Sequence, residues 1–219
     1  MASLDELVEA HGLYGLFRQA RAAEVLGAAD WQFHKTSGRI SFVGATIREI
    51  GVQVLGTESV RERTWLWSWA NTASELPPHV LVAANRMKTL GARAGIGGLI
   101  DPDLRLEHLD ARGLAAMCAV TLDAPAFYRC PYPGGAMYVL LEDESLRDEP
   151  GDALDALCER IEGVVARVEG PLLPHLQQLC GHLALHTEPG ESRLMIRSGE
   201  STAVVEFDEV GGLLAVRRS

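Results

Sequence analysis

The chain has 219 residues, of which 47% are hydrophobic, which is enough for a buried core and argues against long disordered segments. Its 30 acidic residues outnumber 20 basic ones, and the net charge of −10 repels nucleic-acid phosphates and anionic lipid headgroups. No apolar run is long enough to cross a bilayer, and acidic residues near the start, such as Asp5 and Glu9, argue against a signal peptide. We therefore expect a soluble, cytoplasmic protein that binds neither nucleic acid nor membranes.

The first predicted element is a helix. Ser3 and Glu6 form a capping-box pattern, in which each side chain satisfies a backbone amide at the start of a helix. Behind them apolar residues recur every three or four positions, which predicts a helix that runs to about Leu26. Gly12 and Gly15 weaken this helix in its middle.

The apolar pattern then changes to a period of two, which is typical of strands. Trp31 and Phe33 alternate with polar residues, a turn follows at residues 36–38, and Ile40 and Phe42 resume the alternation. The stretches "TIREIGVQVLGT" and "TWLWSWAN" predict two further strands, the second over residues 64–71. Because the connections are short, the four strands are expected to form an antiparallel meander.

Three of the four tryptophans occupy alternate positions of the last strand. If residues 64–71 are extended, Trp65, Trp67 and Trp69 point to one face, where so much apolar surface needs a cover. A buried core is the default cover, and a cleft that leaves one indole partly solvated is the functional alternative. The candidate ligand-binding residues are Trp65, Trp67, Trp69, Asn71, Trp31 and His34.

The remainder of the chain predicts helices and paired strands. Pro77 and Pro78 open a helix that Gly91 can end, a second helix covers about residues 111–120, and "FYRCPYPGGAMYVLLED" reads as a hairpin. A polar break at Pro150-Gly151 suggests two parts: an α+β core domain over residues 1–149 and a C-terminal segment over 150–219, which either forms a second lobe or belongs to the same domain.

The C-terminal segment predicts two helices followed by strands. Residues 154–168 carry apolar side chains at a spacing of three or four, and a second helix is expected from Leu172 to about His186. Three short antiparallel strands follow, joined at Ser198-Gly199 and Gly211-Gly212. The fold class is therefore α+β, with an antiparallel meander packed against helices.

Three stretches of the sequence resemble a known family. The run "VQVLGTES", "TWLWSWAN" and then "AANRMKTLG" is similar to the bacterial domain-of-unknown-function family 6882, over about residues 5–142. Three alternating tryptophans that end in Ala-Asn make this pattern distinctive. The resemblance implies no activity, because none is assigned to that family.

A possible metal site lies on the second C-terminal helix. His175, His182 and His186 fall within about 40° of one another around a helix, and His182 and His186 have the i, i+4 spacing of zinc-binding helices. The catalytic HExxH motif is absent, since the residues between these histidines are "LAL". Leucines on the adjoining face favour structural histidines beside a buried stripe.

Motifs for nucleophilic or phosphate chemistry are absent. There is no GxSxG, and "GARAGIGG" lacks the features of a phosphate-binding loop. Cys130 follows Arg129, which could activate a thiol, but a packed hairpin cysteine is favoured. We expect free, reduced thiols and no cofactor.

Three functions stay open. The first is a non-catalytic binding or interaction module whose partner is an unknown protein, a small hydrophobic molecule or a second copy of the chain in a homodimer. The second is an enzyme of hydrolase or cyclase type whose catalytic groups converge only in three dimensions. The third is a metal-binding protein that uses the histidine helix.

Overall fold

The structure is a computed structural model that describes residues 3–27, 30–44, 47–147, 153–166, 168 and 171–218. Its helices are α1 (Leu4–Leu26), α2 (Val82–Ala94), α3 (Gly97–Ile100), α4 (Ala111–Thr121), α5 (Ala153–Val165) and α6 (Leu172–His182). Its strands are β1 (Asp30–His34), β2 (Arg39–Val43), β3 (Ile47–Ser59), β4 (Thr64–Trp67), β5 (Asp103–Arg105), β6 (Ala126–Tyr132), β7 (Gly135–Leu141), β8 (His186–Pro189), β9 (Arg193–Ser198), β10 (Ser201–Phe207) and β11 (Leu213–Arg218). The predicted α+β class with antiparallel sheets is confirmed.

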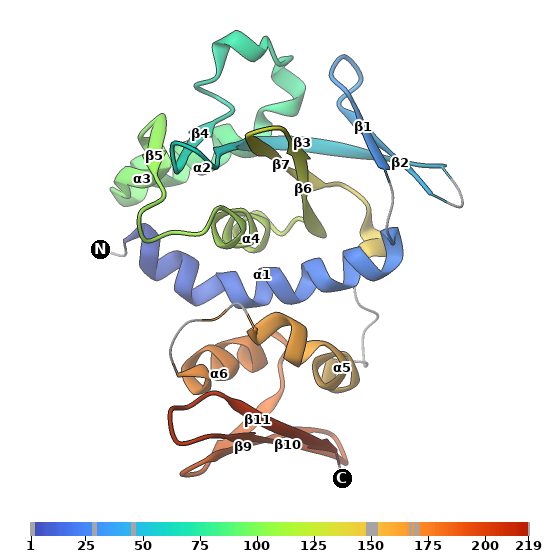
Figure 1. Cartoon of the computed structure of the whole chain (residues 1–219), viewed down its shortest axis with the longest axis vertical. Helices are drawn as coiled ribbons and strands as arrows, with labels where there is room; N and C mark the ends of the chain where they lie inside the picture. The colour runs from blue at the N-terminus through green and yellow to red at the C-terminus, as the bar shows by residue number, and fades with distance from the viewer. Residues whose placement is uncertain are drawn as a thin grey trace.

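The first sheet has seven strands and is organised around the long strand β3 (Figure 1). β2 pairs with residues 47–51 of β3, and β4 pairs with residues 56–59, so these two strands follow one another along one edge. β7 pairs with residues 52–59 on the opposite edge, and β6 completes the predicted hairpin beside it. Each of the four expected strands is thus paired antiparallel with the next, and the later hairpin is added to the other edge of the third strand.

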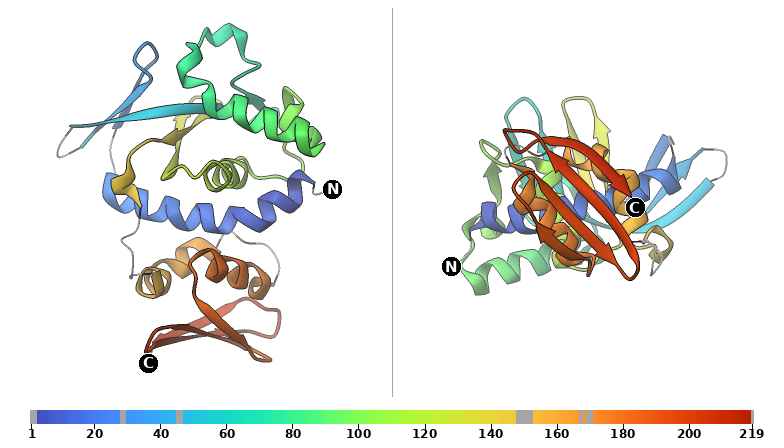
Figure 2. Two further views of the ribbon diagram at one scale, coloured as in Figure 1. Left: turned by 180° about the vertical axis from the view of Figure 1, so that it is seen from behind. Right: turned by 90° about the horizontal axis from the view of Figure 1, so that it is seen from below.

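The elements lie in successive layers. α4 packs beneath the first sheet, α1 packs on α4, and α5 and α6 pack on the far side of α1, above the second sheet β11-β10-β9-β8 (Figure 1). The view from behind shows the same order, and the view from below shows the second sheet lying across the helices behind it (Figure 2). One core cluster joins α4 to the first sheet, and a second joins α1, α5 and α6 to the second sheet.

Helix α1 is buried on two sides, which explains why its apolar residues do not form one clean stripe. Leu4 belongs to the core beneath the first sheet, whereas Leu13 and Phe17 belong to the core of the C-terminal layers. The predicted capping box is present: Glu6 N donates to Ser3 Oγ at 3.1 Å, and Ser3 N donates to the Glu6 carboxylate at 2.7 Å. A helix between two layers cannot present a polar face over its whole length.

Gly15 has a packing role that the sequence pattern did not reveal. A Cβ added to Gly15 would lie 2.4 Å from the carbonyl oxygen of Ala116 in α4, far inside van der Waals contact. At Gly12, one turn earlier, the nearest atom would lie 3.7 Å from an added Cβ, which is an ordinary contact. The absence of a side chain at Gly15 therefore lets the backbones of α1 and α4 approach closely.

The tryptophan strand is shorter than predicted. β4 ends at Trp67, and the backbone amide of Ala70 donates to the carbonyl of Trp67, which closes a turn. Ser68 anchors this turn, since its Oγ donates to the carbonyl of Val54 at 2.6 Å. Trp65 and Trp67 share one face as expected, but the prediction that Trp69 continues the same extended strand is wrong, because these hydrogen bonds turn the chain.

The C-terminal layers also differ from the prediction in one place. α6 ends at His182, Ala184 has a positive φ of 54°, and the chain then enters β8, so His186 lies on a strand. The second sheet therefore has four strands, the three expected ones and β8 at its edge. The predicted break at Pro150-Gly151 lies outside the described residues.

Candidate functional site

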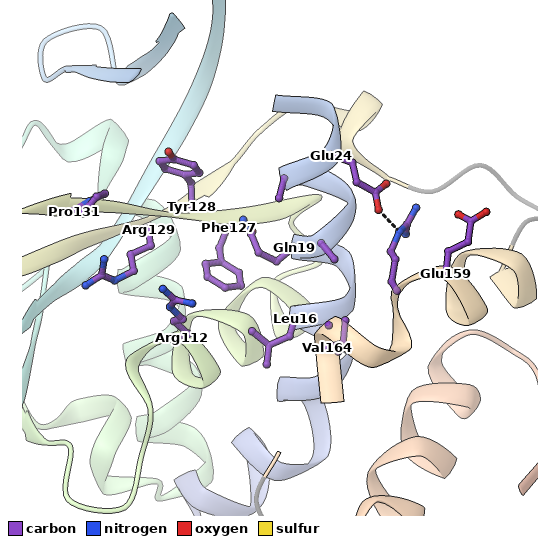
Figure 3. Close-up of a pocket in the computed structure, with 14 residues that line it drawn as sticks. Leu16, Gln19, Glu24, Arg112, Phe127, Tyr128, Arg129, Pro131, Glu159 and Val164 are labelled. Carbon is purple, nitrogen blue, oxygen red and sulfur yellow. Dashed lines mark hydrogen bonds and ion pairs between the residues drawn. The ribbon is translucent and has the colours of Figure 1, made fainter. Parts of the chain in front are cut away.

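A cavity of about 580 Å³ lies where the C-terminal layers meet the rest of the fold (Figure 3). Its walls come from α1, the first turn of α4, strand β6 and helix α5. These elements are far apart in the sequence, and α1 lies between the two layers that supply the others. The cavity therefore exists only when both halves of the fold are assembled on α1.

The walls of the cavity are largely apolar. Leu16, Ala20 and Ala23 line it from α1, and their spacing of three or four residues places them on one face of that helix. Val164 closes it from α5, and Phe127, which is 2% exposed, closes it from β6. This surface suits the hydrocarbon part of a ligand.

Two arginines line the cavity on the β6 side of α1 (Figure 3). Asp110 caps α4 by accepting a hydrogen bond from Gly113 N at 3.2 Å, which places Arg112 in the first turn of the helix. Arg129 lies on the same face of β6 as Phe127, two residues away. Both residues are half-buried.

Arg129 is held in place by a polar network. Its Nε donates to the Tyr138 hydroxyl at 3.2 Å, and one of its terminal nitrogens lies 3.6 Å from a Glu58 carboxylate oxygen. Tyr138 in turn donates to Glu58 at 2.9 Å. Burial, and then the Glu58 carboxylate, raise the pKa of Tyr138, so the phenol stays protonated at neutral pH and positions the guanidinium of Arg129.

The side of the cavity towards α5 carries mixed charge. Arg160 Nε donates to Glu24 at 2.8 Å, and the Arg160 guanidinium also lies 5.4 Å from the ring centre of Phe17. Glu159 is exposed at the rim on the α5 side (Figure 3). Between the two ends, the Oε1 atom of Gln19 is buried and accepts no hydrogen bond from the described part of the chain.

The predicted tryptophan site lies in the core and does not line this cavity. Trp65 and Trp67 are both 0% exposed, with ring centres 5.4 Å apart. Trp67 Nε1 donates to the carbonyl of Gly98 at 3.0 Å, while the buried Trp65 Nε1 has no acceptor in the described structure. Of these two indoles, only Trp67 therefore has an acceptor within the described structure.

The other predicted ligand-binding residues lie in different places. Trp69 is half-buried in the turn after β4, and the Nζ atom of Lys88 lies 3.8 Å from its ring centre. Asn71 accepts a hydrogen bond from Ser74 N at 3.3 Å and so caps a short 3-10 helix. Trp31 lies on β1 beside a separate core cluster, so these aromatic residues do not converge.

His34 makes a local contact on the first hairpin. Its Nε2 lies 2.8 Å from the Ser41 hydroxyl, and Ser41 Oγ lies 3.5 Å from a Glu49 carboxylate oxygen. The three residues lie on adjacent strands, β1, β2 and β3. This arrangement satisfies the polar side chain of buried Ser41, and it does not meet the tryptophans of β4.

The structure separates the three predicted metal ligands. His175 is in the first turn of α6, His182 is its last residue, and His186 is on β8, where its Nε2 lies 3.6 Å from Glu188. His182 faces His11 of α1, with 3.3 Å between their nearest ring nitrogens. Over the described ranges, no group of three or more His, Cys, Asp or Glu side chains is placed to hold a metal ion.

Sequence reasoning missed the residues that line the cavity. Arg129 was noticed only as a neighbour of Cys130, whose pKa is raised by burial, which opposes thiolate formation. The available signal was an arginine between Phe127 and Pro131 on one face of a predicted strand, since a charge at an apolar-facing position needs a partner. Nothing in the sequence placed Arg112 or Gln19 near it.

Comparison with protein-family models gives one match: the family described as "Family of unknown function (DUF6882)", over residues 5–144. No curated protein and no solved structure matched the chain. None of the helices in the described ranges has both the length and the apolar character that a bilayer crossing requires. The family match covers more than half of the 219 residues and agrees with the resemblance carried by the tryptophan motif, so the chain belongs to the DUF6882 family.

Proposed function

We propose that this protein binds a small molecule in the cavity between α1, α4, β6 and α5. The observation that carries the proposal is the cavity itself, in which apolar side chains surround the half-buried Arg112, which has no partner within the described chain. Its volume of about 580 Å³ falls within the range of roughly 300–1,000 Å³ that is usual for ligand sites.

The chemistry of the lining favours binding over catalysis. The cavity is lined by no histidine, cysteine, serine or threonine among the described residues, so the usual nucleophiles are missing from it. Of its two carboxylates, Glu24 is engaged by Arg160 and Glu159 is exposed to solvent. The two carboxylates are therefore not placed together as a general acid and a general base.

Two helical glycines provide a direct test. A Cβ added to Gly163, which lines the cavity from α5, would meet nothing within 4 Å, and the same is true of Gly181 in α6, which does not line it. A leucine at position 163 therefore starts from an open position at the rim of the cavity, and a leucine at position 181 is its matched control. Both replacements also remove a glycine from a helix, so neither should lower stability.

A fragment library screened by ligand-observed NMR against the whole protein gives the measurement. We expect a subset of fragments to bind the wild type and the Gly181→Leu variant equally, and to lose binding to the Gly163→Leu variant. If no fragment binds, or if every bound fragment still binds after Gly163→Leu, the cavity is not the site.

A further inference from the structure

We infer that the ligand carries an anionic group, a carboxylate or a phosphate, which Arg112 and Arg129 bind at the β6 side of the cavity. This inference rests on the proposed function and names the chemical class of the ligand. The charges of the residues that line the cavity, and the partners that these residues have, indicate this class of ligand.

The first observation is that Arg112 lacks a partner. It is half-buried, lines the cavity, and makes no hydrogen bond or ion pair with any described residue. The other arginines without a partner in the described ranges are all exposed, where water solvates them; they are Arg86, Arg93, Arg105 and Arg193. The net charge of −10 means that carboxylates are abundant, yet none is placed against Arg112. An arginine that is partly withdrawn from water without an anion loses solvation that a ligand can restore.

The second observation is that the side chain of Arg129 is already oriented by its neighbours. Tyr138 accepts from its Nε and Glu58 lies 3.6 Å from one terminal nitrogen, so the side chain is fixed before a ligand arrives. A fixed guanidinium loses little conformational entropy when it binds, and its planar donors suit the two oxygens of a carboxylate or phosphate. Glu58 already balances part of the charge of Arg129, so Arg112 supplies the unbalanced positive charge at this end.

The negative groups of the cavity lie elsewhere. Glu24 is paired with Arg160, and Glu159 stands at the rim on the α5 side. Both carboxylates would repel an anion placed at the α5 end of the cavity (Figure 3). This separation gives the cavity a direction: the anionic group lies at Arg112 and Arg129, and the remainder of the ligand extends towards α5.

The remainder of the ligand is expected to be apolar with a hydrogen-bond donor. Phe127 and Leu16 provide hydrocarbon surface next to the arginines, which suits an aryl or alkyl body. The side-chain amide of Gln19 also lines the cavity, so its carbonyl oxygen can accept from a hydroxyl or an N–H of the ligand once the amide turns towards it.

Isothermal titration calorimetry of the whole protein with five small probes tests this class. The probes are benzoate, phenyl phosphate, inorganic phosphate, benzyl alcohol and benzylamine, titrated at one low salt concentration because charge pairing is screened by salt. We expect benzoate or phenyl phosphate to bind more tightly than benzyl alcohol and benzylamine. The first two probes distinguish a carboxylate from a phosphate, and inorganic phosphate shows whether the apolar body contributes.

Matched arginine variants locate the charge. Arg112→Gln is expected to weaken binding of the preferred anionic probe by about 10-fold or more, since a charge-assisted hydrogen bond to a carboxylate or phosphate is lost. Arg61→Gln makes the same charge change at a side chain that is 91% exposed, and it should leave binding unchanged. Arg112 has no protein partner to lose, so circular dichroism and thermal unfolding of the Arg112→Gln variant should match the wild type.

The outcomes separate this inference from the proposed function. If benzyl alcohol or benzylamine binds as tightly as both aryl anions, and Gly163→Leu but not Arg112→Gln abolishes that binding, the cavity is a binding site but the anionic class is wrong. If an aryl anion binds the wild type and binds the Arg112→Gln variant equally well, the assignment of the anionic group to Arg112 is wrong. If no probe and no library fragment binds, both proposals fail.

Discussion

The Nδ1 atom of His11 in α1 lies 3.3 Å from the Nε2 atom of His182 at the end of α6. The His182 ring also stacks on Tyr14, with ring centres 4.5 Å apart. Two imidazoles can share one proton across such a contact, but two imidazolium ions repel each other. This pair therefore links protonation to the packing of the C-terminal layers on α1.

The stability of the protein should fall as the pH drops below about 6.5, the ordinary pKa of histidine. Burial, and then the neighbouring His182, lower the pKa of His11, so the folded state binds fewer protons than the unfolded state in this range. The contribution of His11 is complete above its unfolded pKa and is lost as the pH falls through its folded pKa. Urea unfolding at pH 7.5 and pH 5.5 measures the difference.

The matched variants for this pH dependence are His11→Gln and His108→Gln. His11→Gln should reduce the difference in unfolding free energy between the two pH values, whereas His108→Gln, at an exposed position, should preserve it. An equal pH dependence in wild type and His11→Gln would show that other groups control it.

Gly15→Ala should destabilise the protein, while Gly12→Ala should not. At position 15 the new methyl group would overlap the Ala116 carbonyl at 2.4 Å, and such overpacking costs about 1–3 kcal/mol. At position 12 the nearest atom lies at 3.7 Å, so the gain in helix propensity, roughly 0.5–1 kcal/mol, should prevail. Chemical denaturation of both variants decides, and similar unfolding free energies would mean that α1 and α4 can shift apart at little cost.

Trp67→Phe should cost more stability than Trp65→Phe. Both indoles are wholly buried, so both variants lose similar apolar contacts. Only Trp67→Phe breaks a hydrogen bond, the one to the carbonyl of Gly98, which adds about 1 kcal/mol. Trp65→Phe removes an N–H that has no acceptor in the described structure. Equal losses in urea unfolding would indicate that an unseen acceptor, such as a water molecule, serves Trp65.

Only one cysteine should react readily in the native protein. All four are free thiols; Cys118, Cys130 and Cys180 are buried, and burial raises the pKa of Cys180 to about 12. Cys158 is half-buried on α5, so a reagent can reach it, although burial raises its pKa too. Ellman's reagent at pH 8 should titrate about one thiol before denaturant and all four after it. Cys158→Ser should leave the native protein unreactive, and rapid labelling of that variant would contradict the burial of the others.

Local signals predicted the elements of the fold well. The capping residues Ser3 and Glu6 correctly placed the start of α1, and the turn at residues 133–135 correctly placed the hairpin of β6 and β7. The ends of β4 and α6 were predicted less well. Trp69 alternates with Trp67 in the sequence, but the chain turns after Trp67, where Ala70 N donates to the Trp67 carbonyl and Ser68 Oγ donates to the carbonyl of the distant Val54.

The candidate site could not be predicted, because its residues meet only through tertiary packing. Arg112 and Arg129 are brought to one cavity by the packing of α4 beneath β6, and Gln19 reaches the same cavity from α1. The tryptophans gave the stronger local signal, yet they serve the core. Convergent polar groups on different elements have no fixed spacing in the sequence, whereas an alternating strand does.

The position of α1 between two layers has a consequence for synthesis of the protein. When residues 5–144 have left the ribosome, Leu13 and Phe17 still lack their cover, because the residues that pack on them, such as Leu176 and Val205, have not yet emerged. The nascent chain therefore exposes this apolar surface until the residues through Val205 have also emerged. A truncated chain of this length would need a chaperone or a substitute partner to stay in solution.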